Sequence, residues 1–201
     1  MKRLTASRAG LFTKCLYWLR DDVIWDEGAR GAGAVRGSCV HRFVELYLSG
    51  IPGALALEKC LEGSELDQQD KEDVASMCVA WLNWMEKASH PLTEMLERHR
   101  TSKAGLVEPM YVWNPTTNDS KLWGCQQGRA YPEGWSVGGT ADFVLIGEDI
   151  ACIVDWKTVQ PFADVPEAID QLLLLALLVR KTNPKVKQFM IASVGIDKEK
   201  V

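Results

Sequence analysis

The hydrophobic positions in the first half of the chain recur every three or four residues, the spacing that places them on one face of a helix. Residues 66–88 carry the broadest apolar side, and the segment 38–48 is followed by Ser49, Gly50 and Pro52. We predict helices over residues 5–21, 38–48, 54–62, 66–88 and 91–100. The N-terminal half is therefore expected to be helical.

Residues 26–37 interrupt this pattern with four glycines, together with Arg30 and Arg36. Glycine is conformationally permissive and disfavoured inside helices, so the segment is expected to form a mobile basic loop. A plain linker between two helices is the alternative.

After Lys103 the pattern changes to short stretches rich in valine, isoleucine, tyrosine and tryptophan, separated by turn residues. Strands are predicted in LVEPMYVW, LWGCQQ, GTADFVLI and IACIVDWKT, followed by a helix over 165–181 and a strand over 187–196. This order of elements favours one α/β domain over residues 1–201. Within it, residues 1–103 are expected to be mainly helical, and residues 104–201 are expected to hold a mixed sheet.

The composition is typical of a folded globular protein, because 47% of the 201 residues are hydrophobic and 25% are charged. The longest apolar run, from Leu172 to Val179, is too short to cross a bilayer, and the basic start of the chain leads into no apolar signal core. The six cysteines form no CxxC pair, so neither a zinc ribbon nor a thioredoxin motif is available. We expect reduced thiols, a cytoplasmic location and no membrane partner.

The formal charge of −4 argues against a large nucleic-acid-coating surface, yet the charges are unevenly distributed. Residues 1–42 contain eight lysines or arginines and four acids, whereas residues 43–75 contain two bases and eight acids. A basic face near the N-terminus could guide a nucleic-acid backbone, with ordinary surface solvation as the alternative for each charge. The candidate contacts are Arg8, Lys14, Arg20, Arg36 and Arg42. Trp18, Trp25 and Trp135 are candidates to stack bases, with core packing as their alternative.

Residues 139–158 carry the most informative chemistry, because two predicted strands meet there at a tight turn. If the turn centres on Glu148 and Asp149, Asp142 and Asp155 lie opposite each other, with Cβ atoms about 4.5–5.5 Å apart. Two buried carboxylates this close require either a proton on one of them or a cation between them. A divalent ion is the simpler solution, and carboxylate ligands suit Mg²⁺ or Mn²⁺.

Lys157 lies two residues beyond Asp155, so the two side chains are predicted to share one face of the strand. An ammonium there could orient or deprotonate a water held by the metal and balance the charge of the carboxylates. A structural Asp-Lys pair at the end of a strand is the alternative.

His41 and Glu45 are spaced to lie on one face of a helix, among apolar neighbours. His41 is a candidate ligand for the same metal and Glu45 a supporting group; the alternative is a core histidine hydrogen-bonded to Glu45. Glu108, on the strand before the carboxylate hairpin, is a further candidate ligand or water contact. A strand-edge charge is its alternative.

The order of these residues resembles the PD-(D/E)xK nuclease superfamily, and most closely its RecB-like branch, which includes CRISPR-associated adaptation exonucleases. The resemblance rests on His41 and Glu45, Glu108, GGTAD ending in Asp142, VDWKT, and Gln171 on the next helix. It implies a restriction-endonuclease-like α-β-β-β-α-β core. It also implies a metal held by His41, Asp142, Asp155 and the backbone carbonyl of Trp156, with Lys157 acting on the attacking water. Gln171 would orient Lys157 or bind the phosphate.

Three features depart from the family pattern. Asp155 stands where glutamate is more common, and Leu175 stands four residues after Gln171, where the family often has tyrosine. Iron–sulfur members carry three cysteines after the catalytic core, but none follows Cys152 here, so no iron–sulfur cluster is expected.

The resemblance therefore implies a metal-dependent deoxyribonuclease of a bacterial or phage-infected cell. It implies an exonuclease acting on single-stranded DNA or DNA ends in recombination, repair or replication. One alternative is a nuclease-fold nucleic-acid-binding module with little or no turnover. Another is an unrelated α/β interaction protein in which the hairpin acids are structural. An oligomer or a protein partner stays open.

Overall fold

The computed structural model describes residues 4–5, 31–87, 89–125, 132–158 and 165–198, and the chain divides into two compact units. The first unit comprises Met1–Glu27, Leu106–Asp155 and Ala163–Ser193. The second comprises Gly28–Gly105, Trp156–Phe162 and Val194–Val201. The change of character predicted after Lys103 thus falls close to a unit boundary, but two later segments belong with the helices. A single domain over 1–201 stays a prediction.

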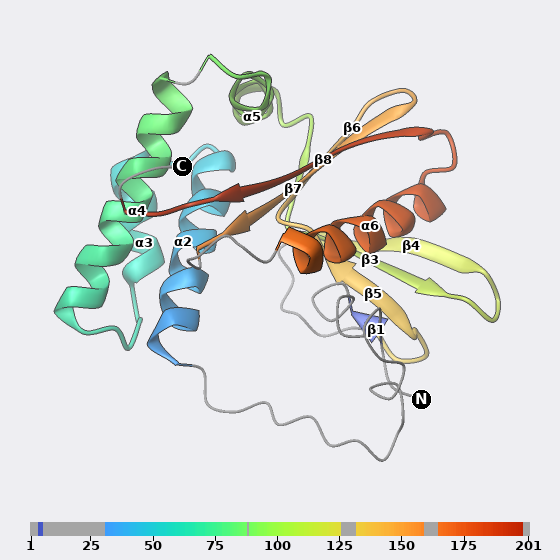
Figure 1. The fold of residues 1–201 in the computed structure, drawn as a ribbon, viewed down its shortest axis with the longest axis horizontal. Coiled ribbons are helices and arrows are strands. Elements are labelled where there is room, and N and C mark those ends of the chain that lie inside the picture. Colours follow the sequence, from blue (N-terminus) through green and yellow to red (C-terminus); the bar gives the residue numbers. More distant parts are fainter. Residues whose placement is uncertain (1–3, 6–30, 88, 126–131, 159–164, 199–201) are drawn as a thin grey trace. The chain divides into compact units, whose positions relative to one another are not determined.

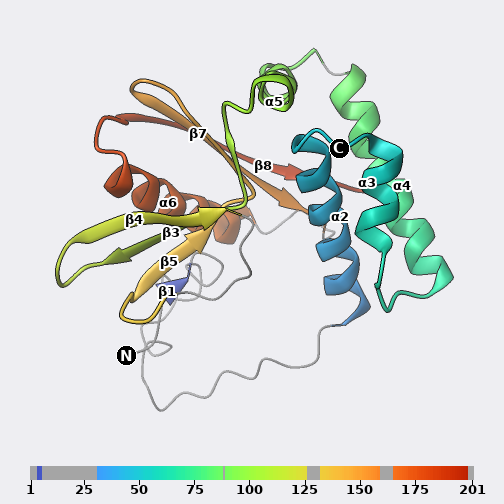
Figure 2. The ribbon, with the colours of Figure 1, turned by 180° about the vertical axis from the view of Figure 1, so that it is seen from behind.

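The second unit is built from helices α2 (Ala32–Leu48), α3 (Gly53–Leu61), α4 (Gln68–Lys87) and α5 (Pro91–Ser102). Helix α2 contacts each of the other three (Figures 1 and 2). Trp81, fully buried on α4, is the centre of their core and meets Phe43, Tyr47 and Trp156 edge to face. The predicted helices 54–62, 66–88 and 91–100 are confirmed, with small shifts of their ends.

Helix α2 begins at Ala32 rather than at the predicted Ser38, so the expected loop is wrong for the described residues 32–37. Arg36 forms salt bridges with Asp70 at 2.9 Å and Asp73 at 3.1 Å, which fasten this turn to α4. Gly37 is buried, and a Cβ atom there would lie 2.8 Å from Oγ1 of Thr158. Glycine is therefore present because another segment approaches closely, rather than because the backbone is mobile.

The first unit holds a four-stranded sheet in the order β1-β5-β3-β4. Its strands are β1 (Leu4–Thr5), β5 (Val137–Thr140), β3 (Pro109–Asn114) and β4 (Asp119–Cys125). Strand β1 is parallel to β5, whereas β3 is antiparallel to both of its neighbours. The helix predicted over 5–21 is wrong at Thr5, which lies in β1; residues 6–21 lie outside the described residues.

A second sheet has the order β2-β6-β7-β8. Its strands are β2 (Leu106–Val107), β6 (Phe143–Ile146), β7 (Ile150–Lys157) and β8 (Gln188–Gly195). Hydrogen bonds from Lys187 N to Asp149 O and from Ile196 N to Lys157 O, both 2.7 Å, show that β8 runs parallel to β7. Helix α6 (Val165–Thr182) connects these two strands, as parallel pairing requires (Figure 1).

Helix α6 contacts β3, β4 and β5 and contributes its apolar side to the core of the first unit. Leu172, Leu175, Leu178 and Val179 pack there with Tyr111, Val144 and Ile153. The mixed α/β class predicted from the order of elements is confirmed. No helix among the described residues is long and apolar enough to cross a membrane.

Candidate active site

Glu108 and Asp142 lie where the chain passes from one sheet to the other. Strand β2 of the second sheet ends before Glu108, and β3 of the first sheet starts after it. Likewise, β5 of the first sheet ends before Ala141 and Asp142, and β6 of the second sheet follows. The two passages are joined by hydrogen bonds, from Glu108 N to Asp142 O at 3.0 Å and from Ala141 N to Pro109 O at 3.1 Å. The backbone therefore holds both acids at one place.

Glu108 adopts a left-handed conformation, with φ of 47°. Residues other than glycine rarely adopt such angles, and strained backbone is concentrated at functional sites. One carboxylate oxygen of Glu108 and one of Asp142 lie within 4.8 Å of each other. The strain thus accompanies a close approach of two acids.

The carboxylate hairpin has the predicted register. Phe143 pairs with Val154, and Val144 pairs with Ile153. The same register continued by one residue brings Asp142 opposite Asp155. One detail is corrected, because GTADFVLI is not one strand: β5 and β6 are separated at Ala141 and Asp142, where the chain changes sheets.

Asp155 lies near the end of β7 and is only 3% exposed. Nε2 of Gln171, on α6, donates a hydrogen bond of 3.0 Å to its Oδ1. Lys157, the last residue of β7, is half-buried. Because side chains alternate along a strand, Lys157 points to the same side of β7 as Asp155, and Trp156 to the other.

Trp156 places its buried indole in the helical core, 6.1 Å from the ring of Trp81. This packing anchors the strand end that carries the two polar neighbours of Trp156. Its backbone carbonyl remains a predicted metal ligand.

His41 and Glu45 lie on α2 in the second unit. His41 is half-buried, while Glu45 is 6% exposed and forms a salt bridge of 2.6 Å with Nη1 of Arg42. Within the first unit, the candidate metal donors are the carboxylates of Glu108 and Asp142. His41 stays a predicted ligand.

The donor chemistry fits a divalent ion of the magnesium or manganese type. Carboxylate oxygens are the protein ligands that suit these ions. Two oxygens bound to one Mg²⁺ are separated by at most about 4.2 Å, twice the usual bond length. The Glu108 and Asp142 oxygens lie within 4.8 Å of each other, close to this limit.

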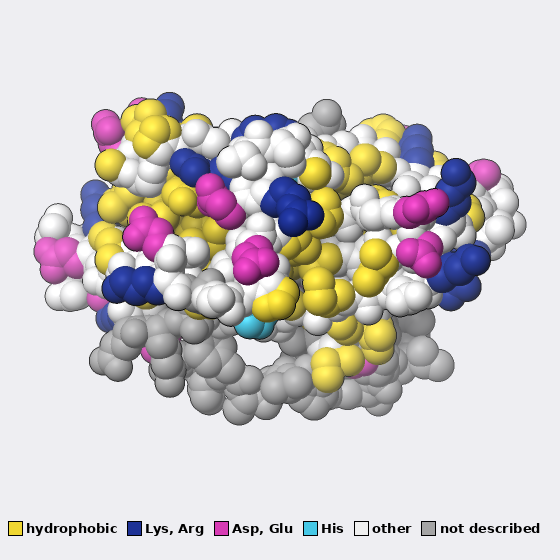
Figure 3. Space-filling model, turned by 90° about the horizontal axis from the view of Figure 1, so that it is seen from above, with side chains coloured by type: hydrophobic (Ala, Val, Ile, Leu, Met, Phe, Trp, Pro, Cys, Tyr) yellow, Lys and Arg dark blue, Asp and Glu magenta, His cyan; other side chains and the backbone are white. Residues whose placement is uncertain are grey.

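The predicted DNA contacts differ in their surroundings. Arg36 is held by Asp70 and Asp73, and Arg42 is paired with Glu45 although its side chain is 52% exposed. On the face drawn in Figure 3, basic and acidic side chains are interspersed. Arg8, Lys14 and Arg20 lie outside the described residues. A role of these five residues in DNA binding stays a prediction.

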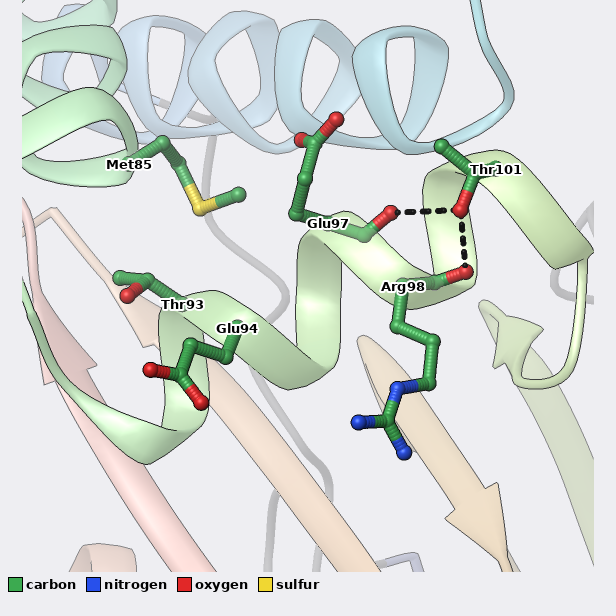
Figure 4. A pocket seen from close by; sticks show the side chains of 6 residues that line it. All are labelled: Met85, Thr93, Glu94, Glu97, Arg98 and Thr101. Carbon is green, nitrogen blue, oxygen red and sulfur yellow. Dashed lines mark hydrogen bonds between the residues drawn. The ribbon is translucent and has the colours of Figure 1, made fainter.

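A surface hollow of about 420 Å³ lies between α4 and α5 and contains none of the predicted site residues (Figure 4). Its rim carries two carboxylates one helical turn apart, Glu94 and Glu97. Thr101 Oγ1 donates to the carbonyl oxygens of Glu97 and Arg98, at 3.2 and 2.9 Å. The hollow is lined by Met85, Thr93, Glu94, Glu97, Arg98 and Thr101.

Sequence reasoning overlooked Lys121 and Trp123, which are exposed on β4. The alternation of Lys121, Leu122 and Trp123 within a predicted strand was the available signal, since it places the lysine and the tryptophan on one face.

The model of the PD-(D/E)XK nuclease superfamily matches residues 3–200, nearly the whole chain. No curated protein matches the chain.

Proposed function

This chain belongs to the PD-(D/E)XK nuclease superfamily, and from that membership we propose that it is a metal-dependent deoxyribonuclease that hydrolyses phosphodiester bonds. We propose further that it is an exonuclease of the RecB-like branch. Its substrates would be single-stranded DNA or DNA ends in phage or bacterial recombination, repair or replication, in the cytoplasm. Membership of the superfamily implies a nucleic-acid substrate and phosphodiester hydrolysis; the finer assignments rest on the order of the motif residues.

The observation that carries this proposal is the meeting of acids at one end of the carboxylate hairpin. The register of β6 and β7 continues to Asp142 and Asp155, and Glu108 is tied to Asp142 by a backbone hydrogen bond. Acids are gathered in this way at considerable electrostatic cost, because like charges across a ladder repel. A bound cation offsets this repulsion. If the acids only supported the fold, the repulsion would not be offset.

The residues that would hold the ion are His41, Asp142, Asp155, the backbone carbonyl of Trp156, and Glu108. When bound, Mg²⁺ or Mn²⁺ supplies charge stabilisation for the phosphate and lowers the pKa of the attacking water.

Side chains of this chain would orient the attacking water, the metal-binding carboxylate and the DNA. Lys157, on the same side of β7 as Asp155, would donate a hydrogen bond to the attacking water and offset the developing negative charge. Gln171 holds Oδ1 of Asp155 and so fixes the direction of its other oxygen. Arg8, Lys14, Arg20, Arg36 and Arg42 would guide the DNA backbone.

The test is nucleotide release from end-labelled single- and double-stranded DNA with Mg²⁺, Mn²⁺ or EDTA. Wild type would be compared with Lys157→Ala and with Lys187→Ala, a matched control whose side chain is exposed outside the site. We expect cleavage that requires metal, survives in the control and is lost in Lys157→Ala. Mononucleotide products would support an exonuclease, whereas internal fragments would indicate an endonuclease.

The second candidate function is a nuclease-fold binding module without turnover. It is favoured by Asp155 and Leu175, which stand where the family more often has glutamate and tyrosine. Metal-dependent thermal stabilisation and DNA binding by a folded wild-type protein, without cleavage in either metal, would support the module and contradict the nuclease.

A further inference from the structure

An exposed cluster of one lysine and two tryptophans lies on the first sheet. Nζ of Lys121, on β4, is 4.6 Å from the ring centroid of Trp123 and 5.0 Å from that of Trp135. Lys121 is exposed, Trp123 is 39% exposed and Trp135 is half-buried. We call these three residues the Trp-Lys platform.

The platform lies on the side of the sheet that faces away from α6. Tyr111 packs in the core with Leu175 and Leu178 of α6. Lys121 lies opposite Val112, the residue after Tyr111, and therefore on the other face of the sheet. Helix α6 and β4 can be followed in Figure 1.

Trp123 lies at a β-bulge. Met110 pairs with Gly124 and Tyr111 pairs with Leu122, so Trp123 has no partner across the ladder. Bulges re-aim side chains and are frequent next to functional sites. The indole of Trp123 is thus exposed at a position where no residue of β3 lies opposite it.

The charge of Lys121 is available to a ligand. In the part of the chain that the structure describes, the salt bridges involve other lysines and arginines, and none includes Lys121. The aromatic rings hold the ammonium near the surface by cation–π attraction, which is weak at exposed sites. A phosphate oxygen can therefore draw the ammonium away from the ring of Trp123.

We propose that the Trp-Lys platform binds single-stranded nucleic acid, with a base stacked on the indole of Trp123 and a phosphate bound by Lys121. An indole and an ammonium side by side match the base and phosphate of a nucleotide. The paired bases of a duplex stack on one another, so only an unpaired strand offers its base faces to the platform. This inference deepens the proposed nuclease function, on which it rests, by naming a binding surface and a strand preference.

The experiment measures binding without cleavage, in EDTA and in a Lys157→Ala background. A fluorescently labelled oligothymidine of about 15 nucleotides, long enough for typical single-strand sites, is titrated with protein. Its anisotropy and the quenching of tryptophan fluorescence are recorded. Trp123→Ala is compared with Trp123→Phe, which keeps an aromatic face, and with Leu122→Ala, a control on the opposite face of the same strand.

We expect Trp123→Ala to weaken binding on the order of tenfold, Trp123→Phe to retain most of it, and Leu122→Ala to match the background protein. Lys121→Ala should weaken binding and reduce its dependence on salt. If Trp123→Ala fails to fold, the proposal is still tested by the quenching of tryptophan fluorescence and by the binding of the Trp123→Phe and Lys121→Ala proteins.

The proposal is overturned if Trp123→Ala and Lys121→Ala bind the oligothymidine as well as the background does, or if duplex DNA of equal length binds equally well. Displacement of the oligothymidine from the platform by polyglutamate at equal charge concentration would also overturn it, in favour of an acidic protein partner. Platform-dependent binding by a wild type that never cleaves DNA would contradict the nuclease proposal alone. Cleavage with no effect of Trp123 would contradict the platform alone.

Discussion

The side-chain amide of Gln171 donates a hydrogen bond of 3.0 Å to Oδ1 of Asp155, joining α6 to the strand that carries the predicted catalytic residues. Asp155 is almost fully buried, so its carboxylate cannot be oriented by bulk water. The hydrogen bond from the Gln171 side chain therefore fixes the orientation of the Asp155 carboxylate and so the direction of its Oδ2.

Replacing Gln171 with leucine should slow cleavage about tenfold or more, because a hydrogen bond to a charged group contributes roughly 1.5–3 kcal/mol. Initial cleavage rates at saturating metal would measure this, beside Gln188→Leu as a control on an exposed β8 position. A Gln171→Leu protein that unfolds at a lower temperature yet cleaves at the normal rate would show that the bond is structural only.

Substitutions of Glu108 should separate backbone strain from metal binding. Glu108→Gly relieves the left-handed conformation and should raise the free energy of unfolding by about 1 kcal/mol in EDTA. Glu108→Gln keeps the strain. If Glu108 is a ligand, both variants should lose part of the thermal stabilisation that Mn²⁺ gives to wild type. Thermal unfolding with and without Mn²⁺ tests this, and an undiminished Mn²⁺ effect in both variants would remove Glu108 from the ligand set.

Replacing each of two glycines of α2 with alanine should change the free energy of unfolding in opposite directions. Gly37→Ala should destabilise by about 1–2 kcal/mol, because its Cβ would lie 2.8 Å from Oγ1 of Thr158. Gly33→Ala should stabilise by about 0.5–1 kcal/mol, because its Cβ would meet only the end of the Arg36 side chain, 4.0 Å away.

Urea denaturation measures both effects, and Thr158→Ala provides the control. In that background Gly37→Ala should become close to neutral. An equal loss of stability with and without Thr158 would mean that another contact opposes the added methyl group.

Stability should fall as the pH drops through the ordinary pKa of histidine. Burial, and secondarily the nearby Lys103 charge, hold the pKa of His99 below its usual value of 6.5. Its Nδ1 accepts a hydrogen bond of 2.8 Å from Gly105 N, which requires an unprotonated nitrogen. Below about pH 6.5, His99 binds a proton in the unfolded chain more readily than in the folded chain, which favours unfolding. The contribution of His99 to the free energy of unfolding is therefore complete above that pH and decreases below it.

Unfolding midpoints between about pH 7.5 and pH 5.5 measure this dependence. His99→Gln should flatten the profile, because it removes the imidazole whose Nδ1 accepts the hydrogen bond from Gly105 N. An identical pH profile for His99→Gln and wild type would assign the dependence to other groups.

The register of the carboxylate hairpin could be predicted because a tight turn at Glu148 and Asp149 joins its two strands, and the position of a turn fixes which residues lie opposite each other. Phe143 indeed pairs with Val154. The break at Ala141 and Asp142 could not be seen in the same way, because a strand that changes sheets keeps a continuous apolar pattern.

The start of α2 could not be predicted for a different reason. Its first turns are held by Arg36 bonding to Asp70 and Asp73, more than thirty positions away, and by the fit of Gly37 beneath Thr158. Local composition contains neither contact, so glycine propensity alone predicts a loop. The bond between Gln171 and Asp155 is likewise hidden in the sequence, although the family resemblance singles out both residues.

The parallel pairing of β7 with β8 has a consequence for synthesis. Strand β7 receives one neighbour from the hairpin, but its other edge is covered by β8, which leaves the ribosome after every other described element. A nascent chain that stops before Gln188 therefore contains Asp155, Lys157 and Gln171 while one edge of β7 still lacks its neighbour. Full assembly of the strand that bears Asp155 and Lys157 must wait until β8 has been translated, so shortened translation products should lack the completed sheet.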